Sequence, residues 1–355
     1  MSTISDIALT EHHARIRGKT VIITGAGAGI GKETAILFAS YGAHVVAADK
    51  DFASADRTAL QIRQSSGDRY VVSCKCDVTD WDEVVAMYEL AIKTFGSVDV
   101  VVANAGVGEV GGLLRHSPNE ERPLVKPMTT TIDVNLTGLL YTVHLAQHYL
   151  EIVQLQMVSS GPSEPYIHVK SVILLGSIAS WFPLAGAPVY TTTKHAVLDV
   201  MRSLDASFTA NGARIASVHP FWADTSLVSD ASRHSVLLGI PLAPVPRIAG
   251  SIFYASTHPD PGTNGAAFLV PDGGALTFMI PRGEFKLGMY QFIDKYSNAK
   301  SVALKWPGYH IRVISVLMRL FWKKLLLISG STSLGVFIVM FFWKRLSSRY
   351  FKLRT

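Results

Sequence analysis

Cysteine is nearly absent from this sequence, with two residues among 355. Cys74 and Cys76 lie two positions apart on one predicted strand, where their side chains share a face but do not readily reach disulfide geometry. No group of histidines and cysteines has the spacing of a metal site. We therefore exclude a disulfide-stapled domain and a metal centre, and we expect both thiols to stay reduced.

The sequence also lacks an N-terminal targeting segment and an internal repeat. Residues 1–10 contain no basic residue and no long apolar run, so they do not form a signal peptide. What remains fits a globular chain, because 48% of the residues are hydrophobic and supply a sizeable core.

Acidic residues are almost missing from the C-terminal part of the chain. Residues 1–284 contain 20 Lys/Arg and 26 Asp/Glu, whereas residues 285–355 contain 13 Lys/Arg and one acidic residue, Asp294. The formal net charge of +6 therefore comes from this tail. A basic tail can bind nucleic acid, but this one is also strongly hydrophobic, and we expect no nucleic-acid partner.

A glycine-rich turn separates a predicted strand from a predicted helix near the N-terminus. Thr20–Thr24 is apolar and β-branched, which is typical of a buried strand. The turn after it has the spacing G-x-x-x-G-x-G, at Gly25, Gly29 and Gly31, with Ile30 where the common G-x-G-x-x-G pattern ends in glycine. Such glycines let the backbone approach a pyrophosphate at a helix N-terminus, so the pattern predicts a dinucleotide site.

An acidic residue ends the next predicted strand, at Asp49. A carboxylate about 20 residues beyond the glycine turn hydrogen-bonds the ribose hydroxyls and repels a 2′-phosphate. We therefore expect NAD as the preferred cofactor. NADP is the alternative, because the adjacent Lys50 softens that preference.

A tyrosine and a lysine four residues apart, Tyr190 and Lys194, share one face of a predicted helix. A cation near a phenol lowers the phenol pKa from about 10, which makes tyrosine usable as an acid or base near neutral pH. Ser177 ends a strand thirteen residues before the tyrosine. A surface helix pair without function is the alternative for an isolated match of this kind.

In chain order these motifs resemble the short-chain dehydrogenase/reductase family, over roughly residues 15–280. The remaining matching positions are Asp77 and Val78, where the family contacts the adenine; Asn104, Ala105 and Gly106 beside the cofactor; Asn135 in the proton relay; and Pro220 and Thr225 near the nicotinamide. The resemblance implies an α/β domain with one Rossmann-like, doubly wound parallel sheet and helices on both faces. It also implies a homo-oligomer, either a dimer or a tetramer, built from the helices that carry Asn135 and Tyr190.

The resemblance further implies hydride transfer between an alcohol carbon and the nicotinamide ring. Tyr190 would take the hydroxyl proton, and Lys194 would hold the nicotinamide ribose and lower the pKa of Tyr190. Ser177 would hydrogen-bond the substrate oxygen, and Asn135 would position a water that links Lys194 to solvent. An NADPH-dependent ketoreductase and a non-catalytic membrane-tethered scaffold of the same fold are the alternatives.

Two segments depart from the family pattern. Phe221 stands where the family has glycine after Pro220, so an aromatic ring narrows the cleft and puts the contact from Thr225 in doubt. Residues 154–168 lengthen the connection to Ser177 and form a predicted surface insertion, because they contain a Ser-Ser-Gly-Pro turn signal. We assign no function to this insertion.

A run of nineteen uncharged residues, Leu325–Trp343, predicts a membrane span. At about 1.5 Å per residue it just crosses a ~30 Å hydrocarbon core, and tryptophans and basic pairs stand at both ends. We expect residues 1–284 to form the dehydrogenase domain, 285–324 a basic amphipathic linker, and 344–355 a basic tail. The domain would face the cytosol, with the endoplasmic reticulum as one candidate membrane. A buried helix that covers the substrate pocket or a subunit interface is the alternative.

The segment Phe221–Pro246, where this family places its variable substrate lid, is rich in apolar residues. Together with membrane attachment, this favours a hydrophobic secondary alcohol or ketone as the substrate. Steroids, terpenoids, retinoids and lipid-like compounds, including secondary metabolites, belong to this class. Packing of the same side chains on the core or on a partner subunit is the alternative.

Overall fold

The computed structural model describes residues 1–67, 70–111, 113, 126–158, 169–225, 239, 241–271, 274 and 276–287. These residues belong to the first of two units into which the chain divides, Met1–Leu287. The predicted span 325–343, the tail 344–355, nearly all of the linker, and residues 226–238 of the lid lie outside the described residues. Among the described residues, no helix has both the length and the apolar character needed to cross a membrane.

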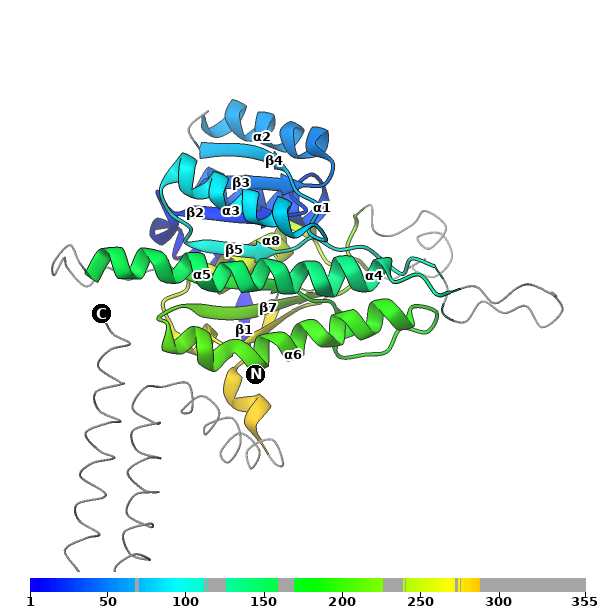
Figure 1. Cartoon of the computed structure of the whole chain (residues 1–355). Coiled ribbons are helices and arrows are strands. Elements are labelled where there is room, and N and C mark those ends of the chain that lie inside the picture. The colour runs from blue at the N-terminus through cyan, green and yellow to red at the C-terminus, as the bar shows by residue number, and fades with distance from the viewer. Residues whose placement is uncertain are drawn as a thin grey trace, which may run out of the picture. The chain divides into compact units, whose positions relative to one another are not determined.

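The described residues form one mixed β-sheet of nine strands, in the order β1-β9-β8-β7-β6-β5-β2-β3-β4 (Figure 1). The strands are β1 Ser2–Ser5, β2 Thr20–Thr24, β3 His44–Asp49, β4 Val71–Lys75, β5 Val100–Ala103, β6 Ser171–Leu175, β7 Arg214–Pro220, β8 Ala267–Val270 and β9 Leu276–Ile280. The strands β2 to β8 pair in parallel, which confirms the predicted doubly wound sheet.

The edge formed by β9 and β1 is antiparallel, which the sequence pattern did not predict. Ser2 pairs with Met279, and the N-terminal amine forms an ion pair with Glu284. A strand with only four residues gives little local signal, and its partner lies far along the chain. Mixed sheets of this class commonly carry such an antiparallel edge strand.

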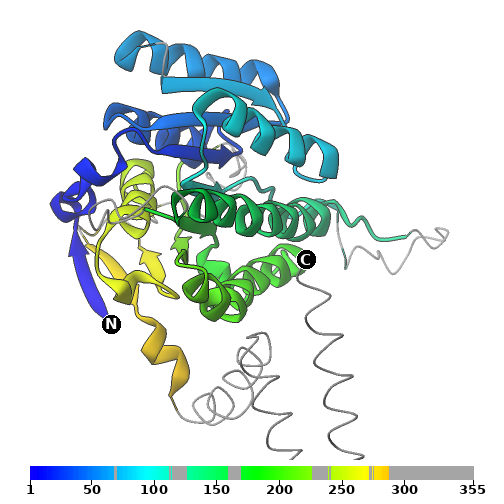
Figure 2. The same cartoon turned by 60° about the vertical axis from the view of Figure 1, so that its left-hand side comes forward.

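Helices cover both faces of the sheet (Figure 2). They are α1 Gly29–Ser40, α2 Phe52–Ser66, α3 Trp81–Phe95, α4 Thr130–Ile132, α5 Leu139–Val158, α6 Pro188–Ala210 and α8 Val245–Thr257, with a π-helix at Asp133–Gly138 and short 3-10 turns η5 Ile178–Ser180 and η7 Arg282–Lys286. Residues 154–158 of the predicted insertion belong to α5, and its remaining residues, 159–168, lie outside the described part of the chain.

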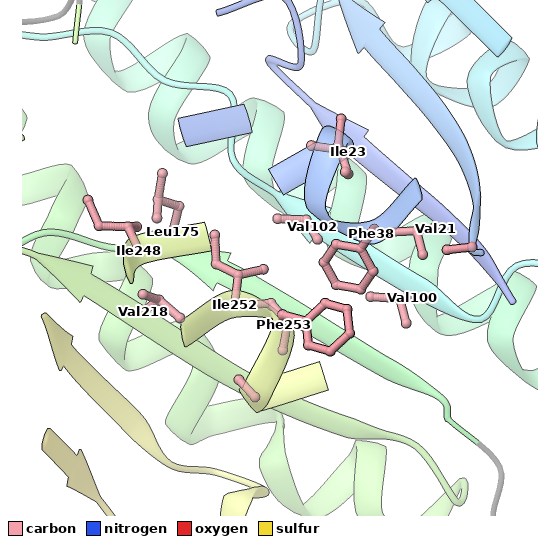
Figure 3. Packing of buried hydrophobic residues seen from close by; sticks show 14 of the residues in the cluster. Val21, Ile23, Phe38, Val100, Val102, Leu175, Val218, Ile248, Ile252 and Phe253 are labelled. Atoms are coloured by element: carbon pink, nitrogen blue, oxygen red, sulfur yellow. The ribbon is translucent and has the colours of Figure 1, made fainter. Parts of the chain in front are cut away.

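Alternate residues of strand β2 pack against the two opposite faces of the sheet. Val21 and Ile23 of β2 pack with Phe38 of α1 and Phe253 of α8, whose ring centroids are 4.9 Å apart (Figure 3). Ile22 belongs to the opposite cluster, with side chains of α3, α5 and α6. Because both faces are covered, all five residues of β2 are buried, which explains its continuous apolar sequence.

The carboxyl ends of the parallel strands meet at one edge of the sheet. The glycine turn follows β2, Asp49 ends β3, Asn104 follows β5, and Ser177 lies two residues beyond the end of β6. This edge is where open α/β sheets bind ligands, at the point where the strand order reverses between β2 and β5.

Candidate active site

The glycine turn adopts the backbone that its sequence predicts. Gly25 and Gly29 have φ values of 68° and 52°, in the left-handed region that favours glycine. A Cβ atom on Gly31 would lie 2.1 Å from the carbonyl oxygen of Gly25. A side chain is therefore excluded at this position, and the helix α1 starts directly against the turn.

The start of α1 is suited to an anion. Its N-cap residue, Ala28, offers no side-chain acceptor to the first-turn amides, and unpaired amides with the positive end of a helix dipole attract phosphate. Asn104 fixes the turn from the other side, because its side-chain Nδ2 donates to the carbonyl oxygen of Thr24 at 2.8 Å and to that of Gly25 at 3.2 Å. These residues fit the pyrophosphate of a dinucleotide.

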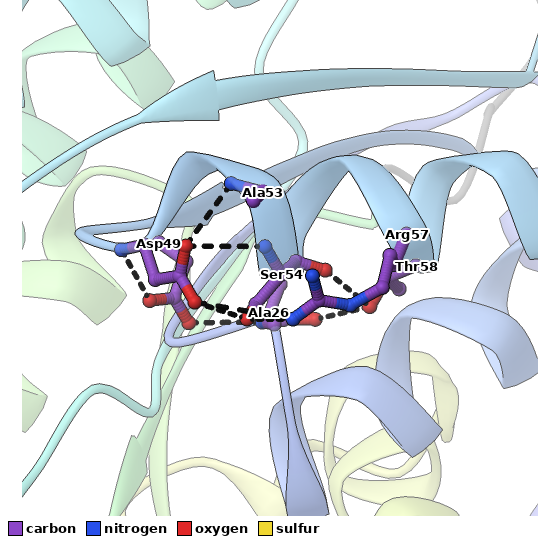
Figure 4. Close-up of polar contacts among 8 residues, drawn as sticks. Ala26, Asp49, Ala53, Ser54, Arg57 and Thr58 are labelled. Carbon is purple, nitrogen blue, oxygen red and sulfur yellow. Dashed lines mark hydrogen bonds and ion pairs between the residues drawn. The ribbon is translucent and has the colours of Figure 1, made fainter.

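Asp49 lies beside the same turn (Figure 4). Its Oδ2 accepts a hydrogen bond from the backbone N–H of Gly27 at 2.9 Å, and its Oδ1 accepts from the N–H of Asp51 at 3.0 Å. A Cβ on Gly27 would lie 2.8 Å from Asp49 Oδ2 and 2.7 Å from the Cβ of Ser54. The carboxylate is thus held at the position where an adenosine ribose would follow the pyrophosphate.

The residues predicted at the adenine are fixed by local contacts. The Oδ1 of Asp77 accepts from the backbone N–H and the hydroxyl of Thr79, at 2.9 and 2.8 Å. The first of these bonds is the main reason that the pKa of Asp77 lies below its ordinary value. Val78 is buried against Gly138, where a Cβ would lie 2.5 Å from Val78 Cγ2. Their contact with adenine stays a prediction.

A cavity of about 220 Å³ opens at the carboxyl edge of the sheet. Of the predicted site residues it is lined by Ile30, Asn104, Gly106, Ser177, Tyr190, Lys194, Pro220 and Thr225. Gly25, Gly29, Gly31, Asp49, Asp77, Val78, Ala105 and Asn135 do not line it. The further lining residues are Val107, Gly108, Glu109, Leu175, Gly176, Ile178, Leu184, Ala187, Phe221, Trp222 and Ala223. The cavity therefore joins the proton-transfer residues to apolar side chains.

Tyr190 and Lys194 of α6 face this cavity together with Ser177. The Lys194 ammonium lies 5.7 Å from the centre of the Tyr190 ring and donates to the carbonyl oxygen of Leu175 at 2.9 Å. Burial lowers the pKa of Lys194 to about 8. Tyr190 hydrogen-bonds the Ser177 side chain, and Ser177 Oγ also accepts from the N–H of Ala179 at 3.1 Å.

The pKa of Tyr190 differs from our expectation. We predicted that Lys194 would lower it, but burial raises the pKa above 10, and only the hydrogen bond with Ser177 opposes this effect. Removing the phenol from water disfavours its charged form more than a single hydrogen bond restores. In this structure the Tyr190 hydroxyl is consequently a proton donor at neutral pH.

A buried histidine supports the turn that carries Ser177. His219 of β7 has its pKa lowered to about 3 by burial, so the ring is neutral. Its Nδ1 lies 3.2 Å from the carbonyl oxygen of Ser177 and must be the protonated nitrogen, because a carbonyl only accepts. Its Nε2 then accepts from the hydroxyl of Ser217 at 2.8 Å.

An aromatic stack extends from this histidine to the end of the described chain. The ring of Trp181 meets His219 edge-on at 5.6 Å, and Phe285 of η7 stacks on Trp181 with centroids 5.8 Å apart. The Arg202 guanidinium lies 5.4 Å from the Phe285 ring centre. Ser177 is thus backed by side chains from α6, β7 and η7.

Asn135 lies next to the proton-transfer residues, inside the π-helix Asp133–Gly138. A Cβ on Gly106 would lie 3.2 Å from Asn135 Oδ1 and 3.7 Å from Lys194 Nζ, which places both groups around this glycine. The Asn135 side chain bonds the backbone of Val107 twice, accepting from its N–H at 2.8 Å and donating to its carbonyl oxygen at 2.9 Å. The predicted water next to Asn135 stays a prediction, whereas its hold on this loop was not foreseen.

Sequence reasoning missed Glu109, which lines the cavity. Its carboxylate accepts from the backbone N–H of Tyr190 at 2.6 Å and from that of Val189 at 3.3 Å. No spacing rule connects a loop glutamate with a helix that begins 79 residues later. The only available signal was its position three residues beyond the predicted Asn-Ala-Gly segment.

Comparison with known proteins agrees with this geometry. The family model described as "short chain dehydrogenase" matches residues 19–235, more than half of the chain. The chain is similar to 5'-hydroxyaverantin dehydrogenase of Dothistroma septosporum, with 30% identity over 241 residues, which cover 65% of this chain and 76% of the relative. It is also similar to cis-4-hydroxycyclohexanecarboxylate dehydrogenase of Sinomonas cyclohexanicum, with 34% identity over 212 residues, or 59% of this chain and 76% of that protein.

The fold is shared with solved structures. One is a 3-ketoacyl-(acyl-carrier-protein) reductase from Brucella melitensis, complexed with NADH, with a TM-score of 0.59 and 24% identity. The alignment covers 73% of this chain and 98% of that structure. The family match and the assembled tyrosine, lysine and serine lead to one conclusion: the chain belongs to the short-chain dehydrogenase family of NAD(P)-dependent oxidoreductases that act on CH–OH groups.

Proposed function

We propose that this enzyme interconverts a secondary alcohol and the corresponding ketone on a hydrophobic substrate, with NAD as its cofactor. The observation that carries the proposal is the cavity itself. Ser177, Tyr190 and Lys194 line the same cavity, and most of the other side chains that line it are apolar. A substrate oxygen held between Ser177 and Tyr190 would leave its carbon skeleton against Phe221 and Trp222.

Each of the three residues has a distinct part in the chemistry. When bound, the nicotinamide ring supplies the hydride acceptor for the alcohol carbon. Tyr190, in its phenolate form, takes the hydroxyl proton, and it returns that proton in the reverse direction. Ser177 donates to the substrate oxygen, and Lys194 would hold the nicotinamide ribose. Because burial raises the pKa of Tyr190, the ketone-reducing direction starts from the protonated phenol that the structure favours.

The preference for NAD over NADP rests on Asp49. Its carboxylate accepts hydrogen bonds from the N–H groups of Gly27 and Asp51, which hold it beside the glycine turn. A fixed negative charge accepts the ribose hydroxyls and repels a 2′-phosphate. Equal or better turnover with NADPH would favour an NADPH-dependent ketoreductase instead.

The substrate class is supported by the cavity walls and by the relatives. Val107, Ile178 and Leu184 line the cavity with two aromatic rings, Phe221 and Trp222. The Sinomonas relative is named for a substrate that has a hydroxylated cyclohexane ring. We therefore infer a cyclic or otherwise bulky hydrophobic alcohol, of the steroid, terpenoid, retinoid or lipid-like kind.

We also propose that residues 325–343 anchor the enzyme in a membrane, with the dehydrogenase domain on the cytosolic side. The support is the uncharged nineteen-residue run between basic pairs. Flotation with phosphatidylcholine vesicles is the test: the full chain should float, and a chain that ends at residue 324 should not. Equal behaviour of the two chains would contradict the anchor.

A homo-oligomer, dimer or tetramer, is part of the same proposal, through the helices that carry Asn135 and Tyr190. It is supported by the family alone. Analytical ultracentrifugation of the detergent-solubilised chain checks it, and a monomer across the concentration range would contradict it.

The decisive experiment measures NADH formation by the full chain over a panel of cyclic and open-chain secondary alcohols, with NADP in parallel. Tyr190→Phe should lower kcat at least ~10²-fold, because the proton acceptor is lost, while NAD binding stays intact. Turnover confined to small polar alcohols would contradict the substrate class. A folded chain that binds NAD and oxidises none of the panel would favour the scaffold alternative.

A further inference from the structure

The helix that carries Tyr190 begins without a capping side chain of its own. Its N-cap residue is Ala187, which has no side-chain acceptor, and Pro188 at the first position has no N–H to donate. The amides of Val189 and Tyr190 therefore need acceptors from elsewhere, because the first turn of a helix has no internal partner for them.

Glu109 supplies these acceptors from a distant part of the chain. One carboxylate oxygen, Oε1, lies 3.3 Å from the nitrogen of Val189, and the other, Oε2, lies 2.6 Å from that of Tyr190. A negative charge at this end of a helix also interacts favourably with the helix dipole. The first two donors of α6 are thus bound by one side chain that belongs to the cavity wall.

The loop that presents Glu109 is itself fastened on both sides. Before the glutamate, Asn135 bonds the N–H and the carbonyl oxygen of Val107. Around it, the hydroxyl of Thr131 donates to the carbonyl oxygen of Gly108 at 3.0 Å and accepts from the N–H of Val110 at 2.9 Å. The backbone at Glu109 is therefore held at neighbouring positions on either side, and its carboxylate is held by the two amides of α6.

We infer that Glu109 is a positioning residue for proton transfer: it fixes the first turn of α6 and so sets where the hydroxyl of Tyr190 meets the substrate. The inference rests on the proposed role of Tyr190. It also gives Asn135 a second function, since the Asn135 side chain holds the loop from which Glu109 reaches α6. The loop after β5 and the helix α6 then act as one rigid frame around the reacting oxygen.

The test compares Glu109→Ala with Glu109→Gln in the full chain, using the best alcohol of the panel. Glu109→Ala should lower kcat roughly 10- to 100-fold, as expected for a small displacement of a reacting group, with the Kd for NAD within about twofold. Glu109→Gln keeps one acceptor oxygen and should recover part of that loss. A kcat in Glu109→Ala that stays within about twofold of the unaltered chain overturns the inference.

Asp80→Ala is the matched control for a lost helix cap. Asp80 Oδ1 accepts from the N–H groups of Asp82 and Glu83 at 2.9 and 3.2 Å, and so caps α3 as Glu109 caps α6. Measured at saturating NAD, Asp80→Ala should lower Tm as much as Glu109→Ala does and leave kcat unchanged. An equal fall of kcat in both variants would mean that Glu109 is only structural.

Amide hydrogen exchange separates this inference from the proposed function. In Glu109→Ala the amides of Val189 and Tyr190 should exchange faster, while those of Asp82 and Glu83 keep their protection. Faster exchange in a chain that oxidises no alcohol would support the Glu109 contact and contradict the function proposed above. Unchanged exchange would overturn the contact itself.

Discussion

The half of the sheet that carries β2 and β3 and the half that carries β6 and β7 present their sites at the same carboxyl edge, but these sites are built differently. In the first half the ligand positions are set by main-chain geometry: glycines with positive φ, a helix start without a capping side chain, and Asp49 fixed by two backbone amides. In the second half they are set by side chains that long-range contacts hold in place, as with Tyr190, whose helix start is bound by Glu109.

This difference explains why the dinucleotide site follows the family pattern while the substrate pocket can differ from one family member to another. A dinucleotide presents the same pyrophosphate to every enzyme, so it can be bound by main-chain groups. A turn that binds in this way needs glycine at fixed positions, which leaves little freedom in its sequence. A substrate pocket made of side chains such as Phe221 and Trp222 can change shape without altering the fold. Phe221, one of the two departures from the family pattern, lines this pocket.

The largest effect that would sharpen this comparison is expected at Lys194, a buried side chain of the second half. Burial lowers its pKa from 10.5 to about 8, so between these values the unfolded chain binds more protons than the folded one. The free energy of unfolding should therefore rise with pH across that window, by roughly 3 kcal/mol from this group. Urea denaturation at about pH 8 and about pH 10 measures the rise.

Lys194→Met provides the comparison for that prediction, because it keeps a long side chain and removes the titrating group. The rise between the two pH values should be smaller in this variant by the contribution of Lys194. The same pH dependence in both proteins would show that the ammonium is not desolvated as the structure indicates.

A smaller effect is expected in the backbone cradle. Gly31→Ala places a methyl group 2.1 Å from the carbonyl oxygen of Gly25, so the turn must shift. We expect a loss of about 1–3 kcal/mol of stability and at least ~10-fold weaker NAD binding. Gly283→Ala is the control, because a Cβ there meets no atom within 4 Å. Calorimetry measures the affinity for NAD. Equal affinity in the two variants would contradict the view that the main-chain geometry of the glycine turn sets the dinucleotide site.

The smallest effect concerns the choice of cofactor. Asp49→Asn keeps the size of the side chain but removes its charge, and should reduce the ratio of kcat/KM for NAD to that for NADP about tenfold. Asp51→Asn alters the neighbouring carboxylate, which caps α2, and should leave the ratio unchanged. A ratio that does not change in Asp49→Asn would place the discrimination elsewhere.

Much of the fold and the centre of the site were predictable because their signals are local. The strand, glycine turn and helix around Gly29 lie within one stretch of sequence, and Tyr190 and Lys194 are one helical turn apart. The missed features join distant segments: β1 pairs with β9, and Glu109 contacts α6 across 80 residues. The direction in which the Tyr190 pKa moves was also not predictable. It is set mainly by how deeply the packed structure buries the phenol, and the lysine four residues later gives no information about that burial.

The aromatic stack behind Ser177 has a practical consequence for anyone who shortens this protein. Phe285 does not line the cavity, yet its ring supports Trp181, and Trp181 contacts the histidine that holds the Ser177 carbonyl. A chain cut for crystallisation at residue 280 would keep every catalytic side chain and still lose the support beneath one of them.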